Sequence, residues 1–179
     1  MGERPQQGSA SRLVAALARV LGALPRPVAA LATAGWMGFI WWLSSGRIRV
    51  RPPLPASDFF FNLAHAPVFG FLAALAAVAL APRPLPRSWP DPGRRARVAA
   101  FAIVMGWAAL DELHQAGVAG RSASPLDFLT DAAGAAGVLW IAAYAGRPSA
   151  HEQGLRRRLA IAAALCLAAA LTTSLTDRS

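Results

Sequence analysis

Five long apolar runs constrain this chain more than any other feature. They cover residues 28–46, 59–81, 98–115, 126–146 and 159–175. A helix needs roughly 20 mainly apolar residues to cross the hydrocarbon core of a bilayer, and each run is close to that length. Because unpaired backbone polar groups are expensive in lipid, such runs favour helices, which satisfy those groups internally. We therefore predict an all-α fold, a polytopic membrane helix bundle.

Charge and composition exclude several other classes of protein. The chain has 179 residues, of which only 15% are charged, against about 25% in a typical soluble domain. Its net charge of +9 would suit a nucleic-acid-binding protein, but such proteins are not built from long uncharged apolar runs. A single cysteine, Cys166, excludes a disulfide framework and a cysteine-based zinc site within one chain. We expect no nucleic-acid partner.

The chain divides into three parts. Residues 1–27 form an N-terminal arm with a short amphipathic helix at 11–24, which is too short to span and is expected to lie on the membrane surface. Residues 28–146 form a four-helix transmembrane core. Residues 147–179 form a basic loop followed by a fifth transmembrane helix.

The arginines predict the orientation. All basic residues are arginine, and most of them fall in the N-terminal arm and in the loops after the second and fourth runs. Loops rich in arginine stay on the cytoplasmic side. The N-terminus is therefore expected in the cytoplasm and the C-terminus outside. An arginine-only, alanine-rich chain is typical of a GC-rich bacterial genome, so we expect the bacterial cytoplasmic (inner) membrane.

Polar side chains gather where this topology places the outer face. These residues are Asp58, Asn62, His65, Asp111, Glu112, His114, Gln115, Arg121, Asp127 and Asp131. Ionisable groups within a spanning segment face a protein interior or a water-filled cavity. The short link at 116–124 makes the third and fourth helices antiparallel neighbours. We therefore predict one outward-facing polar pocket, with Arg121 as its counter-charge.

Structural interpretations of the same residues remain open. Ser124 and Pro125 suit the start of a helix, with Asp127 at its third position as a capping carboxylate. Asp131, like Asp111, would pair with Arg121 to hold two helices together.

Two other polar positions also have a structural interpretation. His65 would be a neutral histidine bonded to a neighbouring helix. The Ser44-Ser45 pair is interpreted as no more than the outer end of the first apolar run.

The core contains a series of short motifs in a fixed order. They are Leu43-Ser44-Ser45, His65 with Phe69-Gly70, Asp111-Glu112-Leu113-His114-Gln115, Gly120-Arg121-Ser122, and Leu126-Asp127-Phe128-Leu129 with Asp131 and Gly134. This series resembles the motifs of the VanZ-like membrane protein family. The order and spacing match from about residue 30 to residue 146. The chain departs from the pattern at Phe61-Asn62, where many members have Asp-Lys, and at Phe69, where tyrosine is frequent.

The resemblance implies a four-helix membrane core and a link to glycopeptide tolerance. The family is named from a glycopeptide-resistance gene cluster, in which its member is associated with teicoplanin tolerance. It supplies a topology and a set of motifs, and no reaction.

Four functions compete for the outer cluster. The first is binding of a membrane lipid or lipid-linked cell-envelope component, through Asn62, His65, Asp111, Glu112, His114, Gln115, Arg121, Ser122, Asp127 and Asp131. The second is an outer-leaflet enzyme, with Asp111, Glu112 and His65 as the catalytic candidates. Together with Asp127 and Asp131 they would supply acid–base groups or ligands for metal-assisted chemistry. The third is an ion relay, although the inner halves of the helices hold no matching acids. The fourth is a purely structural role. No established metal motif such as HExxH is present, so we expect neither a metal nor a cofactor.

Overall fold

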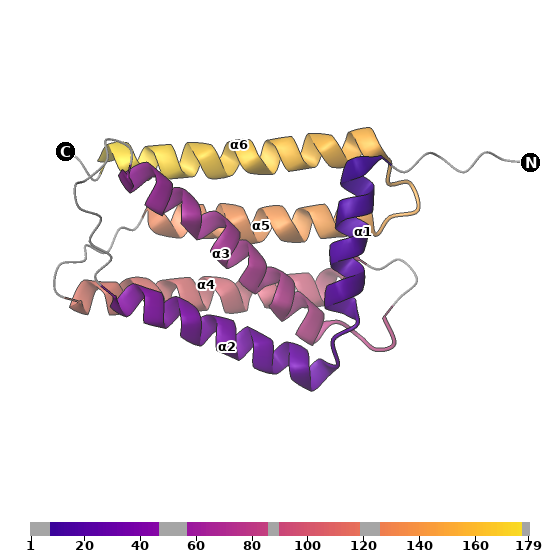
Figure 1. The fold of residues 1–179 in the computed structure, drawn as a ribbon, viewed down its shortest axis with the longest axis horizontal. Coiled ribbons are helices and arrows are strands. Elements are labelled where there is room, and N and C mark those ends of the chain that lie inside the picture. The colour runs from indigo at the N-terminus through magenta and orange to yellow at the C-terminus, as the bar shows by residue number, and fades with distance from the viewer. Residues whose placement is uncertain (1–7, 47–56, 86–89, 119–125, 177–179) are drawn as a thin grey trace, which may run out of the picture.

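The structure is a computed structural model that describes residues 8–46, 57–85, 90–118 and 126–176. Within these ranges it is entirely helical (Figure 1). The elements are α1 (Ser9–Gly22), α2 (Arg26–Ser45), α3 (Ser57–Leu80), α4 (Arg94–Gly117), α5 (Asp127–Ala145) and α6 (Glu152–Thr176). The predicted all-α bundle and its short N-terminal amphipathic helix are confirmed.

Helix α3 organises the bundle. Helices α2, α4, α5 and α6 run lengthwise, α3 crosses them diagonally, and α1 lies across them near one end (Figure 1). Helix α3 packs against all five other helices, most extensively against α5. The buried core is built around Phe69 and Leu72 of α3, Val104 of α4 and Leu139 of α5, with alanines filling the space between them.

Helices α3 and α5 approach each other closely, with backbone facing backbone. A Cβ atom added at Gly134 would fall on the carbonyl oxygen of Ala66, and one at Gly70 would lie 3.2 Å from the carbonyl oxygen of Gly134. Small residues permit such backbone contact between helices in a membrane, where packing rather than water exclusion holds helices together. The glycines therefore fix the depth at which α3 and α5 meet.

Within the described residues, four helices are long and apolar enough to cross a membrane. They are α2, α3 from Phe59, α5 and α6. Helix α6 begins at Glu152, seven residues before the predicted start of the fifth span. The basic residues that directly precede the apolar run belong to the first turns of this helix. The third predicted span differs. Helix α4 is not among the four, because it has arginines in its first turn and the Asp111–Gln115 polar stretch near its end.

The two ends of the bundle differ in chemistry. Every arginine that the structure describes lies at the end where α2, α4 and α6 begin, together with α1; we call it the arginine end. The opposite end, where α2, α4 and α6 finish and α3 and α5 start, is called the polar end. Which end faces the cytoplasm stays a prediction from the arginine distribution.

Candidate functional site

Helices α2 and α4 meet at the polar end through a buried carboxylate. Asp111 and Gln115 are one turn apart on α4, and Gln115 Nε2 donates to Asp111 Oδ2 at 2.9 Å. The Ser44 hydroxyl on α2 lies 2.8 Å from the same oxygen and 3.0 Å from the Ile40 carbonyl, so its single proton is shared between two acceptors. Only 2% of Asp111 is exposed.

The second carboxylate oxygen of Asp111 is different. Asp111 Oδ1 is buried and has no hydrogen-bond partner among the residues that the structure describes. A buried acceptor left without a donor costs about 1–3 kcal/mol, and more when the group is charged. Such a group in a native fold calls for an explanation.

Helices α3 and α5 meet at the same end through an imidazole and a carboxylate. His65 Nδ1 lies 3.0 Å from Asp131 Oδ1, with 20% of the His65 side chain and 1% of the Asp131 side chain exposed. Phe69, one turn further along α3, stacks parallel to the His65 ring with their centroids 6.0 Å apart. Since Gly134 lets α3 approach α5 one turn below Asp131, backbone packing brings the two side chains together.

Electrostatics links the two pairs of helices. Asp127 and Asp111 both lie within Coulombic range of Asp131, and Asp131, Asp127 and Glu112 lie within Coulombic range of His65. Carboxylates from α4 and α5 therefore lie within Coulombic reach of each other and of the imidazole from α3. We call this group the polar cluster; its members are Ser44, His65, Asp111, Glu112, Gln115, Asp127 and Asp131.

Asp127 is placed differently from its prediction. It is the first residue of α5, preceded by Leu126, and not the third, while Ser124 and Pro125 lie outside the described residues. Its buried carboxylate still sits in the first turn, where free N–H groups and the helix dipole favour negative charge. Thr130, on the next turn, is fully buried, and its hydroxyl has no hydrogen-bond partner in the described part of the chain.

Two other predicted site residues make separate contacts. His114 stacks on Trp41 with ring centroids 3.9 Å apart, and its Nε2 lies 2.8 Å from the Ser45 hydroxyl. Asn62 donates to Ser174 of α6 at 3.1 Å. Neither is hydrogen-bonded to Asp111 or to His65 within the described ranges.

Three predicted residues fall outside what is described. Arg121 and Ser122 lie outside the described residues, so the predicted counter-charge stays a prediction. Asp58 belongs to α3, but its side chain is likewise outside the description.

The sequence interpretation of Ser44-Ser45 as a mere helix end is wrong. Ser44 binds Asp111 and Ser45 contacts His114. A signal was present, because Ser44 shares a helical face with Ile40 and Thr33, and all three are buried. Extending that apolar face by one turn predicts that Ser44 points into the bundle.

The chemistry of the polar cluster follows from its donors and acceptors. It offers carboxylate oxygens, one imidazole held by a carboxylate, a hydroxyl and a primary amide. No three histidine, cysteine, aspartate or glutamate side chains come together around a common metal position in the described part of the chain. The arrangement suits hydrogen bonding to a polar group and proton transfer.

Comparison with known proteins agrees with the motifs of the core. A family model described as VanZ/LLP1 matches residues 21–146, which is more than two thirds of the chain and includes the whole polar cluster. No curated protein and no solved structure matches this chain. Helix α1 precedes the match except for its last two residues, and α6 follows the match. This membrane helix bundle belongs to the VanZ/LLP1 family.

Proposed function

We propose that the polar cluster binds the polar headgroup of a membrane lipid or lipid-linked cell-envelope component. The observation that supports it is Asp111, which has one oxygen held by Ser44 and Gln115 and the other without a donor among the described residues. Two fixed bonds orient the carboxylate, and the remaining oxygen accepts from an incoming group. An amine or hydroxyl of a headgroup supplies the missing donor.

The surroundings favour an amphiphile over a free solute. Phe60 and Phe61 on α3 and Trp42 on α2 are large, exposed side chains near the polar end. Aromatic residues at this level suit the boundary between acyl chains and headgroups. A lipid bound there would keep its chains in the bilayer and present only its head to Asp111.

Native mass spectrometry of the protein, purified in gentle detergent, tests this proposal. We expect a co-purifying lipid on the wild type and its loss from Asp111→Asn, because the amide removes the charge and one acceptor. Thr172→Ala is the control. Thr172 is exposed, lies on α6 near the polar end, and its hydroxyl donates to the Ala168 carbonyl of the same helix. Equal lipid occupancy in Asp111→Asn and the wild type would contradict the proposal.

We further propose that the polar end faces outward from the bacterial cytoplasmic membrane and that binding there contributes to teicoplanin tolerance. The family match and the positive-inside distribution of arginines support this assignment. Expression in a teicoplanin-susceptible Gram-positive host is expected to raise the inhibitory concentration for the wild type and not for Asp111→Asn at equal abundance. An unchanged inhibitory concentration for the wild type would remove the link to tolerance and leave lipid binding to its own test.

One contact favours an enzyme as the second candidate. His65 Nδ1 is held by the buried Asp131, and the structure gives Nε2 no hydrogen bond among the described residues. A carboxylate that orients an imidazole in this way prepares the other nitrogen for general acid–base work. Wild type incubated with a bacterial lipid extract would then generate a new headgroup product. His65→Ala would abolish that product, and absence of any product from the wild type would remove this candidate.

A further inference from the structure

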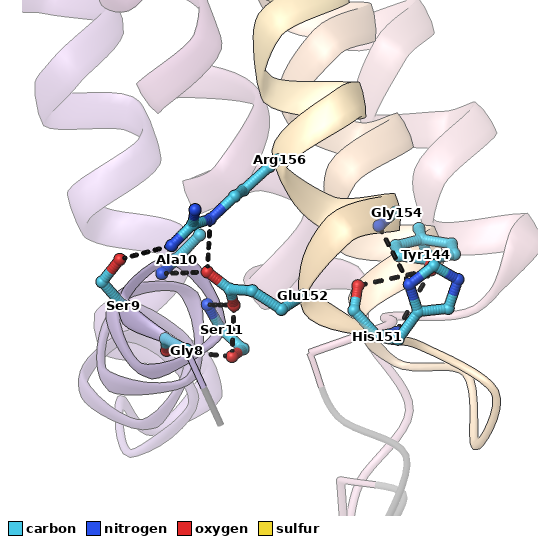
Figure 2. Close-up of polar contacts among 9 residues, drawn as sticks. All are labelled: Gly8, Ser9, Ala10, Ser11, Tyr144, His151, Glu152, Gly154 and Arg156. Atoms are coloured by element: carbon cyan, nitrogen blue, oxygen red, sulfur yellow. Dashed lines mark hydrogen bonds and ion pairs between the residues drawn. The ribbon is translucent and has the colours of Figure 1, made fainter. Parts of the chain in front are cut away.

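Helix α1 is fastened to the bundle at its N-terminus by one carboxylate. Glu152, at the start of α6, accepts hydrogen bonds from the backbone N–H of Ala10 at 3.0 Å and of Ser11 at 2.9 Å, and from the Ser11 hydroxyl at 2.7 Å (Figure 2). Arg156 holds the same carboxylate at 2.8 Å. A carboxylate on the first free N–H groups of a helix also complements the helix dipole.

The C-terminus of α1 is fastened by a charge of the opposite sign. Arg83, just after α3, donates to the carbonyl oxygens of Gly22 at 3.0 Å and Leu24 at 2.9 Å. The last carbonyls of a helix are otherwise without partners, and a cation there is favourable. Helix α1 is thus held at both ends across the spanning helices (Figure 1).

The face of α1 that points away from the bundle is apolar. Ala18 is buried against the bundle, whereas Leu13, Leu17 and Val20 are 60%, 55% and 69% exposed. Their spacing of four and three residues places these three side chains in one stripe on the side of the helix opposite Ala18. We call them the outer stripe. Holding a helix at both ends so that it presents such a stripe to water would be unfavourable.

The charge around the outer stripe identifies what covers it. Arg12 and Arg19 are exposed and seven residues apart, so they share one flank of the stripe. The remaining described arginines lie at the same end of the bundle. Val28 and Leu31, on the first turns of α2, are also exposed and continue the apolar surface toward the spanning segments. An apolar stripe with an arginine flank fits the boundary of an anionic leaflet.

We propose that α1 is a clamped interfacial helix, whose outer stripe enters an anionic leaflet while Arg12 and Arg19 bind phospholipid headgroups. The partner is the bilayer in which the bundle sits, at the arginine end. This surface lies at the opposite end from the polar cluster, so the inference stands independently of the proposed function.

Spin labels on the full chain, reconstituted into vesicles, test this placement. Single cysteines at Leu13, Leu17 and Val20 are introduced into a Cys166→Ser background, and Ser149→Cys, in the exposed loop before α6, is the aqueous control. Vesicles of phosphatidylcholine alone are compared with vesicles that also contain phosphatidylglycerol. We expect the outer-stripe labels to be accessible to oxygen and protected from a water-soluble nickel reagent, with Ser149→Cys showing the reverse. Adding phosphatidylglycerol should move the outer-stripe labels deeper into the bilayer.

Neutralising the flank separates the roles of charge and apolar contact. Arg12→Gln with Arg19→Gln is expected to abolish the deepening by phosphatidylglycerol and to leave the labels in the bilayer. Outer-stripe labels as open to the nickel reagent as Ser149→Cys would overturn the proposal. Labels shielded from both reagents would also overturn it, because they would indicate a protein partner or a second copy of the chain.

Discussion

At the scale of single residues, Asp111 carries most of the argument about function. Its bonds to Ser44 and Gln115 resemble structural bonds within a helix bundle, whereas its Oδ1 is buried without a hydrogen-bond partner in the described part of the chain. The polar groups of a purely structural pair have their hydrogen bonds made within the fold. A binding site, by contrast, keeps polar groups whose hydrogen bonds are completed only when the ligand is bound. Stability and binding of variants at this position therefore distinguish the two roles.

Asp111→Asn is expected to leave the free energy of unfolding within about 1 kcal/mol of the wild type. The amide oxygen can still accept from Ser44 and Gln115, and the substitution removes both the buried charge and the carboxylate oxygen that has no partner among the described residues. Lipid occupancy should fall in the same variant. Thermal unfolding in detergent measures the first quantity. A loss of several kcal/mol would assign Asp111 to the fold instead.

Between elements, the contact of α3 with α5 depends on the missing side chain at Gly134. The neighbouring atoms there belong to the Ala66 backbone, which cannot move without shifting the helix. By contrast, a Cβ atom at Gly106 of α4 would have no neighbour within 4 Å. The two glycines therefore form a matched pair for testing the packing.

Gly134→Ala is expected to lower the free energy of unfolding by about 1–3 kcal/mol through overpacking. Gly106→Ala is expected to raise it by about 0.5–1 kcal/mol, because alanine favours helix over glycine. Denaturation of the reconstituted or detergent-solubilised chain gives both values. Equal effects at the two positions would show that α3 and α5 do not approach as described.

The clamp on α1 makes a prediction about local stability. Glu152→Ala removes the acceptor for the N–H groups of Ala10 and Ser11, so hydrogen exchange in α1 should accelerate while exchange in the spanning helices stays unchanged. Gln153→Ala is the control, since Gln153 is the exposed next residue on α6. Unchanged exchange in α1 after Glu152→Ala would mean that other contacts hold the helix.

Over the whole molecule, hydrophobic runs and polar spacing predicted the architecture because lipid allows few alternatives to helices. The short link between α4 and α5 implied that their polar ends lie together. The sequence pattern did not reveal partners chosen by packing, such as Ser174 for Asn62 or Glu152 for the N-terminus of α1. Those contacts join residues more than a hundred positions apart, and no local periodicity encodes them.

The distribution of arginines predicts the orientation of the bundle in the membrane, with the arginine end in the cytoplasm. In a Cys166→Ser background, Ser122→Cys is expected to react with an impermeant reagent on intact cells. Ser149→Cys, at the arginine end, should react only after permeabilisation. The reverse pattern would place the polar end in the cytoplasm and end the case for an outward-facing site.

The most direct test of the central claim asks whether the two halves of the polar cluster form one site. Native mass spectrometry of Ser44→Ala, Asp131→Asn and the double variant reports lipid occupancy for each. The two positions lie on different helix pairs, where Ser44 bonds Asp111 and Asp131 bonds His65. A shared site predicts that both single variants lose the same lipid and that the double variant loses little more, because coupled residues are not additive. Retention of the lipid in both single variants, or independent losses that add in the double variant, would contradict a single headgroup site.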